Sequence, residues 1–270
     1  MVATLARPAP DELRLPAGAG IAFVDAATGQ AVVQGLTCRL LLRRDSALLG
    51  RARVTTSGVH HWPDLAERWR AAGPAAPVWA DVLVQDEQER FLPLSLPWPL
   101  PAAPSGQVLD VTALGGARLL RVSLLSAPGR STPPGLASLY GLLAWQVDGA
   151  PAAWARVSYL DGDGRVHDGG CDAQGRLALH LPRPRPDRPG SPPAPAAQLR
   201  VFADPALAAA ARRLGAPDVL AFAAQPEVRA RRDAAGDDAY APPPFVTGEP
   251  LVLATLGLPP TQRELRLAPL

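Results

Sequence analysis

The sequence predicts an all-β protein built from two antiparallel β-sandwich domains, with short helices inserted in the second. Three observations predict this fold. Short apolar runs recur along the chain, Pro and Gly fall mostly between them, and one block of the sequence looks like a diverged copy of another. The chain has 270 residues, of which 32 are Pro and 24 are Gly, and 47% are hydrophobic. That hydrophobic fraction is enough for buried cores.

Changes in composition divide the chain into segments. Pro-rich stretches near residues 97–106 and 126–135 mark connections between apolar blocks. We therefore predict an irregular N-terminal lead-in at 1–17, a first β-sandwich domain at 18–104, a linker strand and hinge at 105–135, and a second β-sandwich domain at 136–270 with short helices near 205–225.

In the first domain, apolar runs predict strands at residues 20–25, 36–44, 52–56, 78–85 and 90–96. The run 78–85 alternates apolar and polar side chains most clearly. Pro93 cannot donate to a ladder, so 90–96 is predicted to be an edge strand. Asp64 is a suitable N-cap for a short helix through about residue 72, with Glu67 at the capping-box position.

In the second half, apolar runs predict strands at residues 118–125, 139–147, 153–160, 165–171, 175–181, 198–203, 251–256 and 263–267. The stretch Asp161-Gly162-Asp163-Gly164 predicts a hairpin turn. Alanine-rich runs predict two short helices at 205–215 and 217–225. Asp204 and Asp218 stand at the starts of these runs, where N-caps are expected.

The two halves share an ordered set of features. Each has a turn glycine, an apolar strand, a variable hairpin, a second glycine, and a strand that ends in Asp. The turn glycines are Gly29 and Gly149, and the second glycines are Gly58 and Gly175. This order predicts a repeated supersecondary unit with enough strands for a small sandwich in each copy.

Two of these turns resemble those of the carboxypeptidase regulatory-like, or transthyretin-like, β-sandwich family. They are Thr28-Gly29-Gln30-Ala31-Val32 through Gly35-Leu36, and Asp172-Ala173-Gln174-Gly175 through Leu181-Pro182. The resemblance implies transthyretin/Ig-like sandwiches and marks fold more than function. The first copy departs from the second motif, because Thr56-Ser57-Gly58 has no Asp.

A second resemblance covers nearly the whole chain. Its motifs are Ser57-Gly58-Val59, Asp81, Asp86, Arg90-Phe91-Leu92-Pro93, Leu125-Ser126-Ala127-Pro128, Pro133-Pro134-Gly135, Pro151 to Ala155 and Pro217-Asp218-Val219-Leu220. They are similar to proteins encoded beside phage-tail-like contractile injection systems. The resemblance implies a non-enzymatic structural or adaptor component of such a particle, whose partners are other protein subunits.

The sequence predicts no catalytic, cofactor-binding or metal site. Asp161 opens a stretch similar to a calcium loop, but Arg165 and Asp172 stand where an EF-hand needs an oxygen ligand and a Glu. His60 and His61 are neighbours on an extended segment and point to opposite faces. No G-x-S-x-G, P-loop or dinucleotide motif occurs. The chain also lacks the C-terminal Tyr-Arg-Gly-Ser of 5-hydroxyisourate hydrolases, which leaves a transthyretin-type hydrolase as the third hypothesis.

Charge and hydropathy limit the partners. The formal net charge is +2 and basic residues are interspersed with acids, so no nucleic-acid binding is predicted. No run approaches the roughly 18 apolar residues of a membrane span, so no membrane insertion is predicted. No signal peptide pattern is seen, so we expect synthesis in the cytoplasm and, for a particle component, release in an extracellular particle. Cys38 and Cys171 are expected to be buried and unpaired.

Four residues are candidates for partner contacts. Trp98 lies in a Pro-rich segment and is predicted to be exposed, and Arg183, Arg185 and Arg188 lie in a Pro/Arg stretch suited to docking. Trp79, Trp145 and Trp154 lie in predicted strands and are expected in the core or between domains. The alternative function is a carbohydrate- or surface-binding β-sandwich module that uses exposed Trp side chains.

Overall fold

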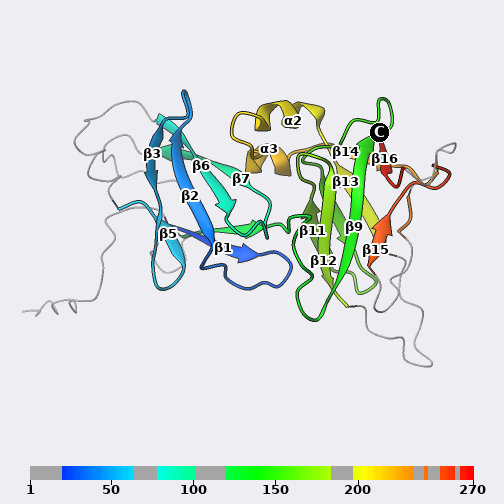
Figure 1. The fold of residues 1–270 in the computed structure, drawn as a ribbon, viewed down its shortest axis with the longest axis horizontal. Coiled ribbons are helices and arrows are strands. Elements are labelled where there is room, and N and C mark those ends of the chain that lie inside the picture. The colour runs from blue at the N-terminus through cyan, green and yellow to red at the C-terminus, as the bar shows by residue number, and fades with distance from the viewer. Residues whose placement is uncertain are drawn as a thin grey trace, which may run out of the picture.

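The computed structural model describes residues 20–63, 78–100, 119–183, 197–233, 240–242, 250–258 and 262–270. Over these residues the protein is mainly β, with two short helices, and its strands fall into two groups that lie side by side (Figure 1). The lead-in predicted at 1–17 and the helix predicted from Asp64 lie outside the described residues.

The first group of strands forms two four-stranded sheets. One sheet has the order β4-β5-β1-β8 and the other the order β3-β2-β6-β7. The strands of the first sheet are β1 (Gly20–Asp25), β4 (Arg53–Val54), β5 (Val59–His61) and β8 (Leu119–Leu124). Those of the second are β2 (Leu36–Leu42), β3 (Leu48–Arg51), β6 (Val78–Asp86) and β7 (Leu94–Leu100).

Strand β6 shows how sequence alternation places side chains in this group. Ala80, Val82 and Val84 face the core between the two sheets, where they join Ile21 and Phe23 of β1. The alternate residues point away from that core, because successive side chains of a strand lie on opposite faces. β6 is buried on both faces over Asp81 to Val84, which leaves its outer face in contact with the second half of the chain.

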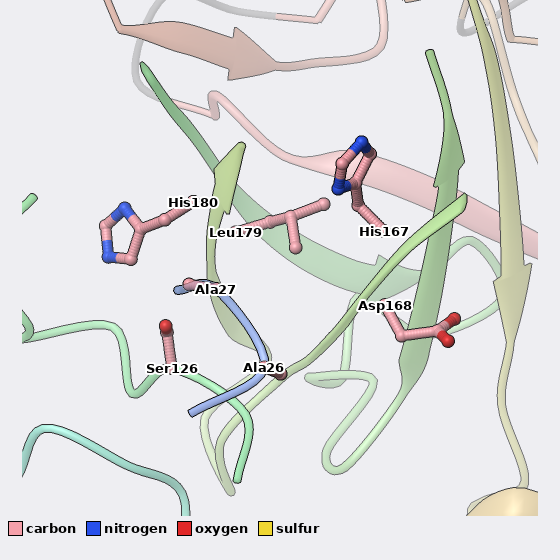
Figure 2. Close-up of a pocket in the computed structure, with 7 residues that line it drawn as sticks. All are labelled: Ala26, Ala27, Ser126, His167, Asp168, Leu179 and His180. Atoms are coloured by element: carbon pink, nitrogen blue, oxygen red, sulfur yellow. The ribbon is translucent and has the colours of Figure 1, made fainter. Parts of the chain in front are cut away.

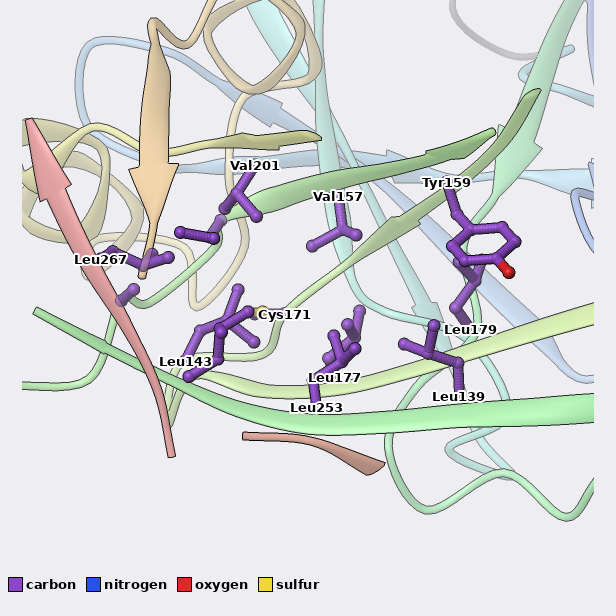
Figure 3. Close-up of a cluster of buried hydrophobic side chains, with 14 of the residues drawn as sticks. Leu139, Leu143, Val157, Tyr159, Cys171, Leu177, Leu179, Val201, Leu253 and Leu267 are labelled. Carbon is purple, nitrogen blue, oxygen red and sulfur yellow. The ribbon is translucent and has the colours of Figure 1, made fainter. Parts of the chain in front are cut away.

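The second group forms one eight-stranded sheet, in the order β11-β10-β13-β14-β16-β9-β12 with β15 added to β9. The strands are β9 (Leu136–Trp145), β10 (Arg156–Leu160), β11 (Val166–Gly170), β12 (Arg176–Pro182), β13 (Gln198–Phe202), β14 (Glu227–Ala230), β15 (Leu251–Leu253) and β16 (Leu265–Pro269). The sheet curls into a half-barrel, because a bridge from Cys171 to Leu177 brings its two ends together. The apolar core fills the inside of this curl (Figure 3).

The pairing corrects the prediction of purely antiparallel sheets. β8 runs parallel to β1, and both β15 and β16 run parallel to β9. Alternation of apolar residues predicts which face of a strand is buried, but it carries no information about strand direction. Parallel pairing needs a long connection, and 93 residues separate Asp25 from Leu119 in the sequence (119 − 25 − 1).

The predicted repeat is confirmed in the strand order. The orders β5-β1-β8 and β3-β2-β6-β7 of the first group recur as β12-β9-β16 and β11-β10-β13-β14 in the second. The turn glycines also correspond. Gly29 at φ 71° donates to Asp25 O at 2.8 Å, and Gly149 at φ 70° donates to Trp145 O at 2.9 Å. Backbone positions with positive φ favour glycine, which explains the residue type at both positions.

Two helices lie between the groups of strands (Figure 1). They are α2 (Pro205–Ala211) and α3 (Val219–Ala223), and the predicted N-caps are confirmed. The Asp204 side chain accepts from the Ala206 amide at 2.8 Å, and the Asp218 side chain accepts from the Leu220 amide at 2.9 Å. Both helices are shorter than predicted, and Gly215, which takes a left-handed conformation at φ 66°, ends the turn that follows α2.

Candidate functional site

A buried acid lies where the two groups of strands meet. Asp81, on the outer face of β6, is 1% exposed. Its Oδ1 lies 2.7 Å from Nη2 of Arg43, and its Oδ2 lies 2.7 Å from Nη2 of Arg213. Arg43 belongs to the first half of the chain and Arg213 follows α2 in the second. A buried carboxylate is costly unless it is paired, so both arginines are needed in place.

Further contacts extend this junction. Arg43 Nη2 also reaches Asp218 Oδ2 at 3.1 Å, and the hydrogen bond that Arg43 donates to Asp81 raises the pKa of Arg43. The Ser95 amide of β7 donates to Pro217 O at 2.9 Å. A small apolar cluster joins Leu41 and Leu83 to residues between the helices, Leu214 and Ala216. The helical segment is therefore fixed to the first group of strands by charge, backbone hydrogen bonding and apolar packing together.

A second polar cluster lies at the end of β1. Arg130 donates to Asp25 Oδ1 at 2.9 Å and to Oδ2 at 2.6 Å, and it also donates to Ser126 Oγ at 2.9 Å. Burial by itself raises the pKa of the Asp25 carboxyl. Hydrogen bonds from Arg130, Thr28 and the Ala27 amide outweigh that effect and hold the pKa at about 2.

His180 lies beside this cluster and is 1% exposed. Its Nδ1 is 3.0 Å from Ser138 Oγ, while its Nε2 is buried without a hydrogen-bond partner among the described residues. Burial lowers the pKa of His180, and the nearby charge of Arg130 lowers it further, against the opposing effect of Asp25. The ring is therefore held neutral at pH 7.

The cavity at His180 is too small for a substrate. Its volume is about 10 Å³, the room of a single water molecule, and Ser126 and Leu179 line it together with His180 (Figure 2). His167 and Asp168 also line it, on the other side of Leu179 from His180. The Ser, His and Asp side chains of this region thus enclose a water-sized space rather than a binding pocket.

The larger hollow is an open cleft of about 910 Å³ between the two groups of strands. Residues of both groups and one side of α2 enclose it. Apolar side chains supply much of its surface, including aromatic rings and prolines: Phe91, Leu92, Pro93, Pro128, Trp145, Pro151, Trp154 and Pro205. Concave surfaces of this size that combine apolar walls with a few polar groups are typical of binding sites.

The charged residues of the cleft divide into paired and free groups. Asp86 is paired with Arg90 at 2.8 Å, and Asp172 is paired with Arg176 at 2.7 Å. Glu89 makes no side-chain hydrogen bond or ion pair within the described part of the chain, and Asp148 uses one carboxylate oxygen to accept from the Ala150 amide. Both carboxylates are exposed and keep acceptor capacity for a ligand.

Backbone strain is concentrated in this cleft. Of the described residues other than glycine, Ser46, Glu89 and Trp154 have positive φ, and the last two line the cleft at φ 54° and φ 61°. Such conformations cost about 1–2 kcal/mol for residues with a side chain. Trp154 is held by packing against Leu207 and Ala211 and by a bond from Gln225 Nε2 to its carbonyl at 2.9 Å.

The predicted contact residues do not gather in one place. Trp98 is half-buried against the first core, 6.3 Å from the ring of Trp62. Arg183 is exposed, with Nε 3.4 Å from Leu136 O at the end of β12. Arg185 and Arg188 lie outside the described residues.

Of the other tryptophans with a predicted position, two lie where expected and one does not. Trp145 and Trp154 line the cleft, as expected for residues between domains. The expectation for Trp79 was wrong, because this side chain is 48% exposed, with the guanidinium of Arg43 5.9 Å from its ring. The buried ion pairs of Asp81 were not predicted, although an acid inside an otherwise apolar run is a usable signal for one.

The remaining candidate sites have structural explanations. Cys38 and Cys171 are buried and unpaired, and burial raises the pKa of the Cys38 thiol to about 12. Asp161 Oδ1 accepts from the amides of Asp163 and Arg165, which closes the predicted hairpin turn. Within the described ranges, no three His, Cys, Asp or Glu residues lie close enough together to hold a metal ion. No helix there has the length and hydropathy to cross a bilayer.

No protein-family model matches this chain, and no curated protein matches it in sequence.

Proposed function

We propose that this protein is a non-enzymatic structural or adaptor component of a phage-tail-like contractile injection particle. In this role it acts through contacts with other protein subunits. The observation that carries the proposal is the junction at Asp81, where Arg43 and Arg213 from the two halves share one buried carboxylate. Two β-rich bodies held at a fixed angle are suited to placing partners relative to one another.

Exposed strand edges support a role in protein contacts. β3 and β4 stand at the ends of their sheets, and in the described part of the chain β15 pairs with β9 alone. Each carries a large exposed apolar side chain: Leu48, Val54 and Val252. Exposed strand edges are templates for strand addition by another chain, and monomeric proteins usually protect such edges.

The recurring strand order supports a finer proposal about the fold. We propose that the two groups of strands are variants of one transthyretin-like β-sandwich, as the Gly29 and Asp172 motifs suggest. The setting in an injection particle rests on the sequence resemblance of the turn motifs. Synthesis in the cytoplasm and release within a particle belong to the same proposal.

Affinity purification from the native host tests the proposal. The tagged full chain is isolated from cell lysate and from released particles, and the co-purifying proteins are identified by mass spectrometry. We expect sheath, tube or baseplate subunits in stoichiometric amounts. Recovery of none of these subunits, together with the absence of sheath and tube genes beside the gene for this chain, would reject the particle assignment.

A second candidate function is carbohydrate or surface binding. The observation that favours it is the exposed ring of Trp79 on β6, a surface on which a sugar ring could stack. A glycan array probed with the wild type and with Trp79→Ala tests this role. Trp98→Ala serves as the control, because that side chain is half-buried. An array without signal for the wild type removes this candidate.

A further inference from the structure

The cleft between the two groups of strands has the chemistry of a site for a proline-rich, arginine-bearing chain. Its apolar rings include Trp145 and Phe91, and its carboxylates without an ion-pair partner among the described residues belong to Glu89 and Asp148. Proline-rich segments dock in aromatic-lined grooves, because their extended conformation is already restricted and their rings pack on aromatic faces. Arginine side chains in the same segment would pair with the free carboxylates.

Free basic groups on the cleft wall are fewer than free acids. Arg90 and Arg176 are engaged by Asp86 and Asp172, and Arg212 on α2 is the remaining base that lines the cleft in the described part of the chain. The wall is therefore complementary to a ligand of net positive charge. A neutral polyproline segment would leave the carboxylates of Glu89 and Asp148 without partners.

This chain contains a segment with the required chemistry. Residues 182–195 read PRPRPDRPGSPPAP, with three arginines, one aspartate and seven prolines. The net charge of this segment is +2 (three Arg minus one Asp). We infer that the cleft of one molecule binds the 182–195 segment of a second copy.

The position of the segment's ends favours a second copy over the same molecule. β12 ends at Pro182, which pairs with Leu136 at the start of β9. Gln198 starts β13 and pairs with Leu160, which also pairs with Val166 at the start of β11. The bridge from Cys171 to Leu177 sets β11 against β12 in a register that places Val166 level with Pro182. Both ends of the segment therefore leave the sheet at the same end.

Trp145, which lines the cleft, lies at the opposite end of β9. The ten residues of β9 span about 30 Å from Leu136 to Trp145. Residues 184–196 cover at most about 45 Å when fully extended, which is less than the distance to Trp145 and back. The segment therefore cannot lie along Trp145 of its own molecule.

This contact joins one end of a molecule to the cleft of the next, so it is heterologous. Heterologous contacts build rings when the rotation closes and filaments when it does not. The inference rests on the proposed function as a particle component, since it names one of the protein contacts through which that function is exercised. It assigns to Arg185 and Arg188 the role of pairing with Glu89 and Asp148 of the neighbouring molecule.

Sedimentation velocity of the full chain over a concentration series tests the inference. We expect wild-type protein to associate with increasing concentration. The cleft variant carries Glu89→Arg and Asp148→Asn, and the Asn keeps the oxygen that accepts from the Ala150 amide. The segment variant carries Arg185→Glu and Arg188→Glu. Each variant should associate about tenfold more weakly or not at all.

The decisive experiment combines variants in which the charges of the cleft and of the segment are reversed. A mixture of the cleft variant and the segment variant should associate more strongly than either variant alone, because the wild-type cleft of one meets the wild-type segment of the other. A chain that carries all four substitutions pairs a basic cleft with an acidic segment, and its self-association should recover. Asp163→Arg, on the exposed β10–β11 turn, is the control and should associate as wild type does.

A synthetic peptide of residues 182–195 keeps the test valid if a variant fails to fold. The fluorescently labelled peptide should bind wild-type protein in anisotropy titrations, and a peptide with glutamate at each arginine position should not. Monomeric wild-type protein at every concentration overturns the inference, even with peptide binding, as does association that survives in both variants. Wild-type protein that does not self-associate, while particle subunits are still recovered with it, rejects this inference alone. Self-association without those subunits rejects the proposed function alone.

Discussion

The two copies of the repeat have the same strand order but close their sheets differently. In the first copy the last two strands, β7 and β8, belong to different sheets, and the Leu92 amide just before β7 donates to Leu125 O just after β8 at 2.9 Å. In the second copy the equivalent strands, β14 and β16, pair directly. One pattern of strands therefore produces two separate sheets in one copy and a continuous half-barrel in the other.

The copies also differ at one left-handed turn. Gly35, just before β2, has φ 80°, and Trp154, just before β10, has φ 61°. Glycine adopts this conformation without steric cost, whereas tryptophan does not. The second copy tolerates the tryptophan because its ring packs under α2, an element that the described part of the first copy does not place there. Tertiary packing has thus replaced a local requirement for glycine.

The largest expected effect on stability comes from adding a Cβ at a tightly packed turn glycine of the second copy. Gly175 has φ 73°, and a Cβ there would lie 2.4 Å from the backbone oxygen of Leu143. Gly175→Ala should lower the free energy of unfolding by about 3–5 kcal/mol, combining conformational strain with a clash that only the backbone can relieve. Urea denaturation followed by circular dichroism measures this change.

Gly29→Ala is the matched control for that substitution. Gly29 has φ 71°, but nothing lies within 4 Å of its added Cβ. The expected loss is about 1 kcal/mol, from the backbone conformation alone. Equal decreases in the free energy of unfolding for the two variants would contradict the conclusion that the backbone of Leu143 approaches Gly175 too closely for a Cβ.

Trp154 offers a test of strain against packing. Trp154→Ala should destabilise the protein by about 3 kcal/mol, since the ring is 5% exposed and packs on Leu207. Trp154→Gly should be about 1 kcal/mol more stable than the Ala variant, because glycine relieves the positive φ. Thermal or urea unfolding of both variants decides the order. An Ala variant more stable than the Gly variant would argue against strain at this residue.

Two buried histidines predict how stability changes with pH. Burial is the main cause that lowers the pKa of both His60 and His180. The unfolded chain therefore binds protons at a higher pH than the folded protein does. Stability is full above the unfolded pKa of about 6.5 and is lost as pH falls below it, toward the lowered folded pKa values.

His60→Leu separates the contribution of the first copy. His60 pairs with Ile21 in β1, and the corresponding residue of the second copy is Leu177, which pairs with Gly141 in β9. Urea midpoints at pH 7.5 and pH 5 should differ less in His60→Leu than in the wild type. An unchanged difference would place the pH dependence outside the first copy.

The smallest expected effect concerns the turn that lacked an Asp in the first copy. Asp172 Oδ1 accepts from the Arg176 amide at 2.9 Å, and Thr55 Oγ1 accepts from the Val59 amide at 3.0 Å in the corresponding turn. Thr55→Ala should cost about 1 kcal/mol through loss of this bond. Thr55→Asp should be nearly neutral. A neutral Thr55→Ala would show that the hydroxyl does not replace the carboxylate.

Much of the fold could be predicted from the sequence, but little of the candidate site could. The turns at Gly29, Asp161 and Gly175 follow from local chemistry, and so do the caps at Asp204 and Asp218. The cleft has no local signature, because its walls come from turns separated by more than a hundred residues. Trp79 and Trp98 show the same limit, since neither exposure follows from the neighbouring residues.

The sequence by itself determined where most strands, turns and helix starts of this protein lie, and that two halves follow one order, but β3, β5 and β14 lie outside the predicted strands. These features depend on alternation, glycine conformation and capping, which act between residues close in the chain. The tertiary structure alone decided the parallel pairing of β1 with β8, the closure of the second sheet and the sharing of Asp81 by Arg43 and Arg213. Those outcomes depend on burial and pairing between distant segments, which no local pattern encodes.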